Sequence, residues 1–207
     1  HSLAAALWHT SFAGLEQGRC EEAEPRIDEM LRLGEQSGLS FFRSLALGFR
    51  GRLLVERGDA QAGICAIGEA RRLHASLGFE LDEAYMVRDL ADAYRRVERI
   101  EEGVALADEG IAAAIRTGAG FMLAEHHRIR GELLACRPGN TPEVERELRT
   151  ARSIAREQQA HLYELRAAIG LARLRWDEGR HDSARGLLED SYEAFSARFA
   201  EIARSLA

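Results

Sequence analysis

The stretch LGFRGRLLVERGD, residues Leu47 to Asp59, returns in altered form as HRIRGELLACRPGN, residues His127 to Asn140. When the two are aligned on the shared R-G-x-L-L, Gly51 and Gly131 lie 80 residues apart. Each stretch reads as the end of a helix followed by a turn, because a run with apolar residues at helical spacing stops at glycine-containing turn residues. The recurrence indicates an internal repeat, and an internal repeat decides the fold.

The turn and the helix after it can be aligned five times along the chain. The aligned segments are QGRCEEAEPRIDEML from Gln17, RGDAQAGICAIGEAR from Arg57, VERIEEGVALADEGI from Val97, PGNTPEVERELRTAR from Pro138 and EGRHDSARGLLEDSY from Glu178. A small or apolar residue recurs in steps of 40, 40, 41 and 40, at Ala23, Gly63, Gly103, Val144 and Ala184. We therefore expect one repeat domain over residues 1–207, with repeats at about 3–38, 40–78, 81–118, 121–160 and 162–200, cut from a longer chain.

Glycines mark two further positions of the repeat. Gly38, Gly78 and Gly118 follow the second helix of a pair, where a left-handed residue ends a helix, whereas the fourth repeat has EQQAH there. Gly51 and Gly131 are expected where the two helices of a pair approach closely.

The composition favours an all-α protein. The chain is rich in Ala, Leu, Glu and Arg, with only three prolines and 7% aromatic residues. We expect a right-handed superhelical solenoid of about ten antiparallel helices, in which each repeat contacts mainly its neighbours. No apolar run reaches the ~18 residues of a membrane span, and no charged segment followed by an apolar one marks secretion, so a cytoplasmic location and no membrane partner are expected.

Several classes of site are excluded by residue type. All 28 basic residues are arginine, which removes a Walker A lysine and a Schiff-base lysine. The three cysteines form no C-x-x-C, and the adjacent pair His126 and His127 points in directions about 100° apart on a helix, which suits surface or groove positions better than a shared ion. We expect no metal, no cofactor and no catalytic residue, and a net charge of -6 makes nucleic acid an improbable partner.

Position for position, the units resemble the tetratricopeptide repeat (TPR). Its small eighth-place residue corresponds to Ser11, Gly51, Ala91, Gly131 and Ala172. Its twenty-seventh place corresponds to Met30, Ala70, Gly110, Ala151 and Ser191. The period here is longer, which implies longer helices.

The segment from Ala124 to Phe195 also resembles the C-terminal repeats of bacterial proteins that join a nucleotide-cyclase or DNA-binding domain to a predicted ATPase. This resemblance implies a non-catalytic interaction and regulatory module of a multidomain signal-transduction protein. The partner would be a protein or peptide, or the ATPase or output domain of the same chain. The alternatives are a small-effector sensor, as in maltotriose-responsive activators, and a self-association scaffold that forms a homodimer.

The repeat register places one set of side chains on the predicted concave groove formed by the first helices. These are Trp8, Phe12, Arg52, Tyr85, Arg88, Arg95, Arg128, Arg173 and Trp176. Guanidinium groups beside aromatic rings bind carboxylates and stack on planar groups, which predicts an acidic peptide or an anionic effector as ligand. In a chain without lysine, the alternative is that these arginines pair with the chain's own glutamates.

Overall fold

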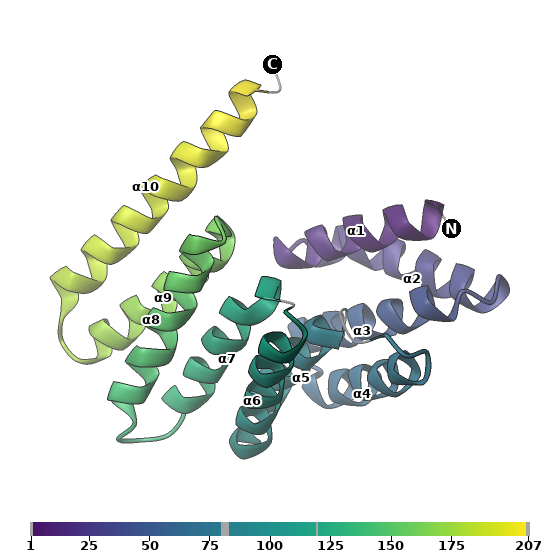
Figure 1. Ribbon diagram of the computed structural model, residues 1–207, viewed down its shortest axis with the longest axis horizontal. Helices are drawn as coiled ribbons and strands as arrows, with labels where there is room; N and C mark the ends of the chain where they lie inside the picture. The colour runs from purple at the N-terminus through teal and green to yellow at the C-terminus, as the bar shows by residue number, and fades with distance from the viewer. Residues whose placement is uncertain (1, 80–82, 119, 206–207) are drawn as a thin grey trace. The chain divides into compact units, whose positions relative to one another are not determined.

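The computed structural model describes residues 2–79, 83–118 and 120–205 (Figure 1). Within these ranges the chain contains ten α-helices, one short 3-10 helix and no strand, which confirms the predicted all-α class. The helices are α1 (Ser2–Glu16), α2 (Cys20–Gln36), α3 (Ser40–Glu56), α4 (Ala60–Ser76), α5 (Glu83–Arg96), α6 (Ile100–Thr117), α7 (Leu123–Ala135), α8 (Thr141–Glu157), α9 (His161–Asp177) and α10 (His181–Ser205). The 3-10 helix, η1 (Gly120–Met122), precedes α7.

The helices form pairs, each with an odd-numbered first helix and an even-numbered second helix. The second helix packs against its own first helix and against the first helix of the following pair, as α2 does with α1 and α3, and as α8 does with α7 and α9. The chain divides into two compact units, His1–Leu106 and Ala107–Ala207, with the boundary inside α6. That the array is a single domain stays a prediction.

Glycine ends the second helices as the sequence predicts. Gly38, Gly78 and Gly118 have φ of 65°, 76° and 70°, the left-handed conformation that glycine adopts without a steric cost. In the fourth repeat Gln159 occupies this position with a φ of 56°. The repeat therefore keeps its turn geometry where it has lost its glycine.

The glycine of R-G-x-L-L lies at a close approach between the helices of a pair. A Cβ on Gly51 would lie 3.0 Å from the backbone oxygen of Gly63 and 2.5 Å from the Ile67 side chain, both in α4. A Cβ on Gly131 would lie 3.0 Å from Leu148 in α8. The predicted contact is confirmed at both positions.

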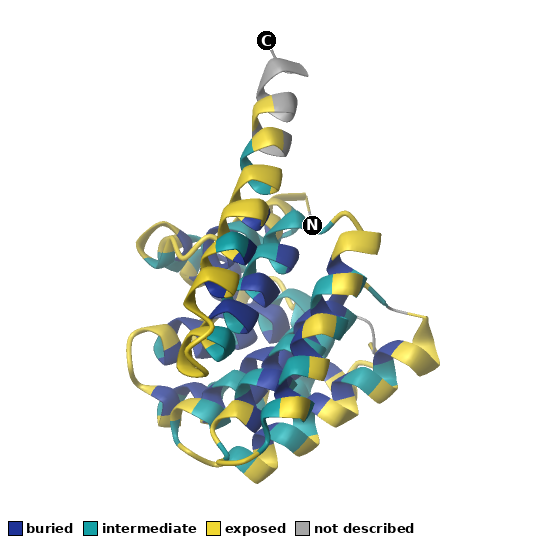
Figure 2. Cartoon of the chain, turned by 90° about the vertical axis from the view of Figure 1, so that its left-hand side faces the viewer, coloured by how far each residue is buried: buried dark blue, intermediate teal, exposed yellow. Residues whose placement is uncertain are grey.

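Each unit buries apolar side chains of its own helices. Figure 2 shows by colour that buried and exposed residues alternate along the helices. Ile27 and Ile67 are fully buried in the first unit, as are Leu133 and Leu171 in the second. Across the described ranges, no helix has the length and apolar character that crossing a membrane requires.

Candidate functional site

Two of the predicted groove arginines are buried together in the first unit. Arg52 in α3 donates from Nη1 to Glu16 Oε1 at 2.5 Å and from Nη2 to the Leu15 carbonyl at 2.9 Å. Arg88 in α5 donates from Nη1 to the same Glu16 oxygen at 2.8 Å and from Nε to Asp89 Oδ1 at 2.8 Å. We call Glu16, Arg52, Arg88 and Asp89 the N-terminal ion cluster.

The charges of this cluster balance. Two guanidinium groups face two carboxylates, Arg52 Nε also lies 3.9 Å from Asp89 Oδ1, and all four residues are at most 9% exposed. A buried charge is tolerated only when it is paired, and here each guanidinium is paired within the unit. The cluster thus joins α1, α3 and α5 and leaves no net positive charge there for a ligand.

The predicted aromatic residues of the first unit pack against one another. The rings of Phe12 and Tyr85 have centroids 4.8 Å apart in an edge-on arrangement, and Phe12 also lies 6.4 Å from the Phe49 ring. Trp8 contacts the edge of Phe41 at 6.3 Å. All three predicted residues are half-buried, so most of their ring surface serves the packing of α1, α3 and α5.

Arg95, in the last turn of α5, pairs with Asp92 rather than facing solvent alone. Its Nη2 lies 2.6 Å from Asp92 Oδ1, while Arg96 Nε lies 3.0 Å from the other carboxylate oxygen. Burial by itself would raise the pKa of Asp92, but the charges of Arg95 and Arg96 outweigh it and hold this pKa below its ordinary value.

In the second unit Arg128 belongs to another ion cluster, in which Glu125 is buried and the other members are half-buried. Its Nε and Nη2 donate to both oxygens of Glu125 at 2.7 and 2.9 Å, and its Nη1 donates to Glu132 at 2.6 Å. Arg166 of α9 donates to Glu125 at 3.2 Å. Burial lowers the pKa of Arg128, but the Glu125 and Glu132 charges exceed that effect and raise it. We call Glu125, Arg128, Glu132 and Arg166 the C-terminal ion cluster.

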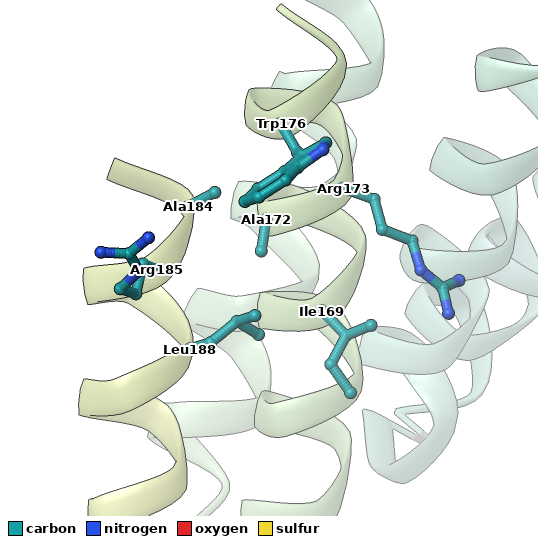
Figure 3. A pocket seen from close by; sticks show the side chains of 7 residues that line it. All are labelled: Ile169, Ala172, Arg173, Trp176, Ala184, Arg185 and Leu188. Atoms are coloured by element: carbon teal, nitrogen blue, oxygen red, sulfur yellow. The ribbon is translucent and has the colours of Figure 1, made fainter. Parts of the chain in front are cut away.

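The last two predicted residues, Arg173 and Trp176, line an apolar hollow between α9 and α10 of about 370 Å³ (Figure 3). The other lining residues are Ile169, Ala172, Ala184, Arg185 and Leu188. Trp176, which is 54% exposed, stands at one end of this α9–α10 hollow, and its ring lies 4.3 Å from that of His181.

Both arginines at the hollow lie on its rim. Figure 3 shows the guanidinium of Arg173 directed away from α10 and that of Arg185 on the opposite flank. Neither group has an ion pair or a hydrogen bond within the described residues. The hollow therefore combines an apolar floor with two uncompensated positive charges.

Within each unit the predicted residues have different surroundings, and that all nine line one groove stays a prediction. Arg52 and Arg88 lie inside an ion cluster with the aromatic residues beside it, Arg128 lies in a second cluster, and Arg173 and Trp176 lie at the hollow. Sequence reasoning restricted to first helices missed the contribution of α10, Arg185 and Leu188. The repeat alignment itself carried that signal, because it places Leu188 in line with residues of the core such as Ile27.

The two adjacent histidines, His126 and His127, have different environments. His126 is fully buried with its ring against Gly110 of α6, so the surface or groove position expected for it is wrong. Nδ1 of His127 lies 2.7 Å from Glu147 Oε2. Among the described residues, no three His, Cys, Asp or Glu side chains are grouped in a way that would hold a metal ion.

In comparisons with known proteins, the chain matches solved structures but no family model and no curated sequence. Two crystal structures of a putative kinesin light chain from Podosopora anserina with nearly identical TPR-like repeats are similar to the chain, each at 16% identity. Their TM-scores are 0.61 and 0.59, with 97% and 94% of this chain and 99% and 95% of theirs covered.

The crystal structure of BtubC (BKLC) from P. vanneervenii is similar as well. It has a TM-score of 0.65 at 14% identity, covering 92% of this chain and 78% of that one. At these identities the likeness shows the fold alone. The chain is a TPR-like helical repeat array, as its resemblance to that repeat implied.

Proposed function

We propose that the chain is a non-catalytic protein-interaction and regulatory module that binds a segment of a partner protein on the α9–α10 hollow. The observation that supports this is the exposure of Leu188. Its equivalents in the four earlier repeats, Ile27, Ile67, Ala107 and Leu148, are at most 2% exposed, whereas Leu188 is 38% exposed. An apolar position that the repeat otherwise keeps covered is a surface suited to a partner.

The setting we propose is a multidomain bacterial signal-transduction protein of the cyclase–ATPase or transcriptional-regulator type, in the cytoplasm. The resemblance of Ala124 to Phe195 to the repeats of such proteins supports it. The partner is then another protein or the ATPase or output domain of the same chain, whose activity the bound array biases.

The small-effector alternative receives less support from the hollow. Its volume lies within the range of ligand pockets, but such pockets enclose most of the ligand surface. Here both Trp176 and Leu188 are open to solvent, which suits a flat or helical protein surface better than a small molecule.

Selection of helical peptides tests the proposal. A displayed library of helical peptides with unconstrained charge is selected against the chain, and the enriched peptides are then titrated against the Leu188→Asp variant. We expect enriched peptides to bind the chain and to lose at least about tenfold in affinity for that variant, because a buried charge in an apolar contact costs more than 1.4 kcal/mol.

Ile115→Asp is the matched control, since Ile115 is 69% exposed and lies on α6, outside the hollow. The control variant is expected to bind like the parent. No enrichment, or binding that is unaffected by Leu188→Asp, rejects the proposed function.

A further inference from the structure

The earlier repeats show what kind of element covers the position of the hollow. In the fourth repeat the first helix of the next pair, α9, packs on α8, and its Gly170 lies over Leu148, the equivalent of Leu188. A Cβ on Gly170 would lie 3.0 Å from the Leu148 side chain. In the fourth repeat the cover of this position is therefore a helix that places a small residue over the leucine.

Ion pairs fix the direction in which such a helix lies. Glu24 in α2 pairs at 2.6 Å with Arg57, which directly follows α3, and Glu145 in α8 lies 3.8 Å from Arg180 after the end of α9. Glu24 and Glu145 occupy the same repeat position, one residue after Ala23 and Val144. In both cases a carboxylate on the second helix meets an arginine at the C-terminal end of the covering helix.

The last repeat reverses the charge at this position. The residue after Ala184 is Arg185, which has no ionic partner among the described residues. A covering helix would bring its C-terminal end to Arg185, where an acidic side chain would pair and the negative end of the helix dipole would add to the attraction. The chemistry of the occupant is thus opposite to that of α3 and α9.

The start of the covering helix meets a different surface. Arg71 and Arg152 pair with glutamates that lie near the starts of α5 and α9, namely Glu83 at 2.8 Å and Glu164 at 3.6 Å. The equivalent residue of α10 is Tyr192, which is 64% exposed. An amphiphilic ring replaces a cation there, so an N-terminal acidic residue gains no partner.

Resting on the proposed function, we propose that the α9–α10 hollow binds an amphipathic helix of another protein that sets a small residue over Leu188 and carries Asp or Glu at its C-terminal end beside Arg185. The specificity of the module lies in this reversed charge.

Two designed peptides test the inference. Both are 17-residue helices, the length of α9, with an apolar stripe interrupted by one alanine, and they differ only in having Glu or Arg in the last turn. Their affinities for the chain and for Arg185→Glu are measured by fluorescence anisotropy at several salt concentrations. The control variant is Arg72→Glu, because Arg72 is an exposed arginine of α4 that also lacks an ionic partner among the described residues.

The acidic peptide is expected to bind the parent chain about fivefold or more tightly than the basic one, since replacing an attractive with a repulsive exposed pair changes binding by about 1 kcal/mol or more. Arg185→Glu is expected to invert this preference, Arg72→Glu to leave it unchanged, and added salt to reduce it. Binding by both peptides that depends on Leu188 but not on peptide charge would overturn the inference while leaving the proposed function in place.

A second copy of the chain is the competing occupant. Analytical ultracentrifugation of the parent and of Leu188→Asp decides between the two. A monomer at all concentrations is expected, whereas a dimer that Leu188→Asp dissociates would overturn binding of an acidic partner helix in favour of self-association.

Discussion

The α3–α4 and α7–α8 hairpins carry the same R-G-x-L-L yet pack at different distances. At Gly51 an added Cβ would meet backbone of α4, including the Gly63 oxygen at 3.0 Å, whereas at Gly131 it would meet the Leu148 and Glu147 side chains at 3.0 to 3.3 Å. The position equivalent to Gly63 holds Val144 in the second hairpin. The closeness of a helix pair is therefore set by the residue opposite the motif as much as by the motif.

The two hairpins also differ in the charge of the residue that follows the motif's glycine. Arg52 follows Gly51 and Glu132 follows Gly131, and each lies in the ion cluster of its own unit. The N-terminal ion cluster is built from two cations at most 11% exposed in their side chains, while Arg166 of the C-terminal ion cluster is 23% exposed. One repeat position thus accepts either sign when neighbouring helices supply the opposite charge.

Glu16→Gln is expected to have the largest effect on stability. It would leave Arg52 and Arg88 buried with only Asp89 between them, and removing one partner of a buried ion pair costs about 3–5 kcal/mol. The urea midpoint followed by circular dichroism should fall sharply. Glu35→Gln, at an exposed position of α2, is the control and should leave the midpoint unchanged.

Glu125→Gln tests whether the two clusters differ as their exposure indicates. Arg128 would keep Glu132, and Arg166 has water within reach, so the loss should be about half that of Glu16→Gln. An equal or greater loss would show that burial of Glu125 itself, which is fully enclosed, outweighs the exposure of its partners.

Gly51→Ala against Gly131→Ala tests the difference in helix spacing. The new methyl at position 51 presses on the α4 backbone, so overpacking of about 1–3 kcal/mol should exceed the gain in helix propensity. At position 131 the methyl would meet side-chain atoms of Leu148 and Glu147 and no backbone, so a smaller shift relieves the contact and the two terms should nearly cancel. The comparison of spacing fails if both variants melt at the same temperature.

Much of the fold could be predicted from the repeat period and from the glycines at helix ends and helix contacts. The 40-residue steps, the glycines after the second helices and the close approach at Gly51 and Gly131 are each local features with one physical meaning. The left-handed Gln159 is the case that local reasoning left open, since the turn geometry is kept there by the surrounding repeat and not by the residue.

The candidate site was harder to predict from the sequence than the fold. Register placed Arg52 and Arg88 on one side of their helices, but whether a guanidinium faces a ligand depends on carboxylates from other helices, such as Glu16, 36 residues before Arg52. Arg173, which aligns with Arg52 in the repeat, is exposed and lacks such a neighbour among the described residues. The difference depends on ion pairs between residues of different helices, and the residue pattern of one helix does not predict such pairs.

The smallest effects are expected at Glu98 and Gln159, which among the described residues are the two non-glycine residues with positive φ, one in each unit. Glu98 and Gln159 adopt φ of 58° and 56°, a conformation that costs an L-residue about 1–2 kcal/mol, and both side chains are exposed. Replacement by glycine removes this strain but adds entropy to the unfolded chain, so Glu98→Gly and Gln159→Gly should each stabilise by about 0.5–1 kcal/mol. The reciprocal change Gly78→Gln should destabilise by a similar amount, because a Cβ at Gly78 has no neighbour within 4 Å and only the backbone is strained. Urea midpoints of the three variants measure this, and a lower midpoint for Gln159→Gly would mean that the glutamine side chain contributes more to the fourth repeat than its backbone strain costs.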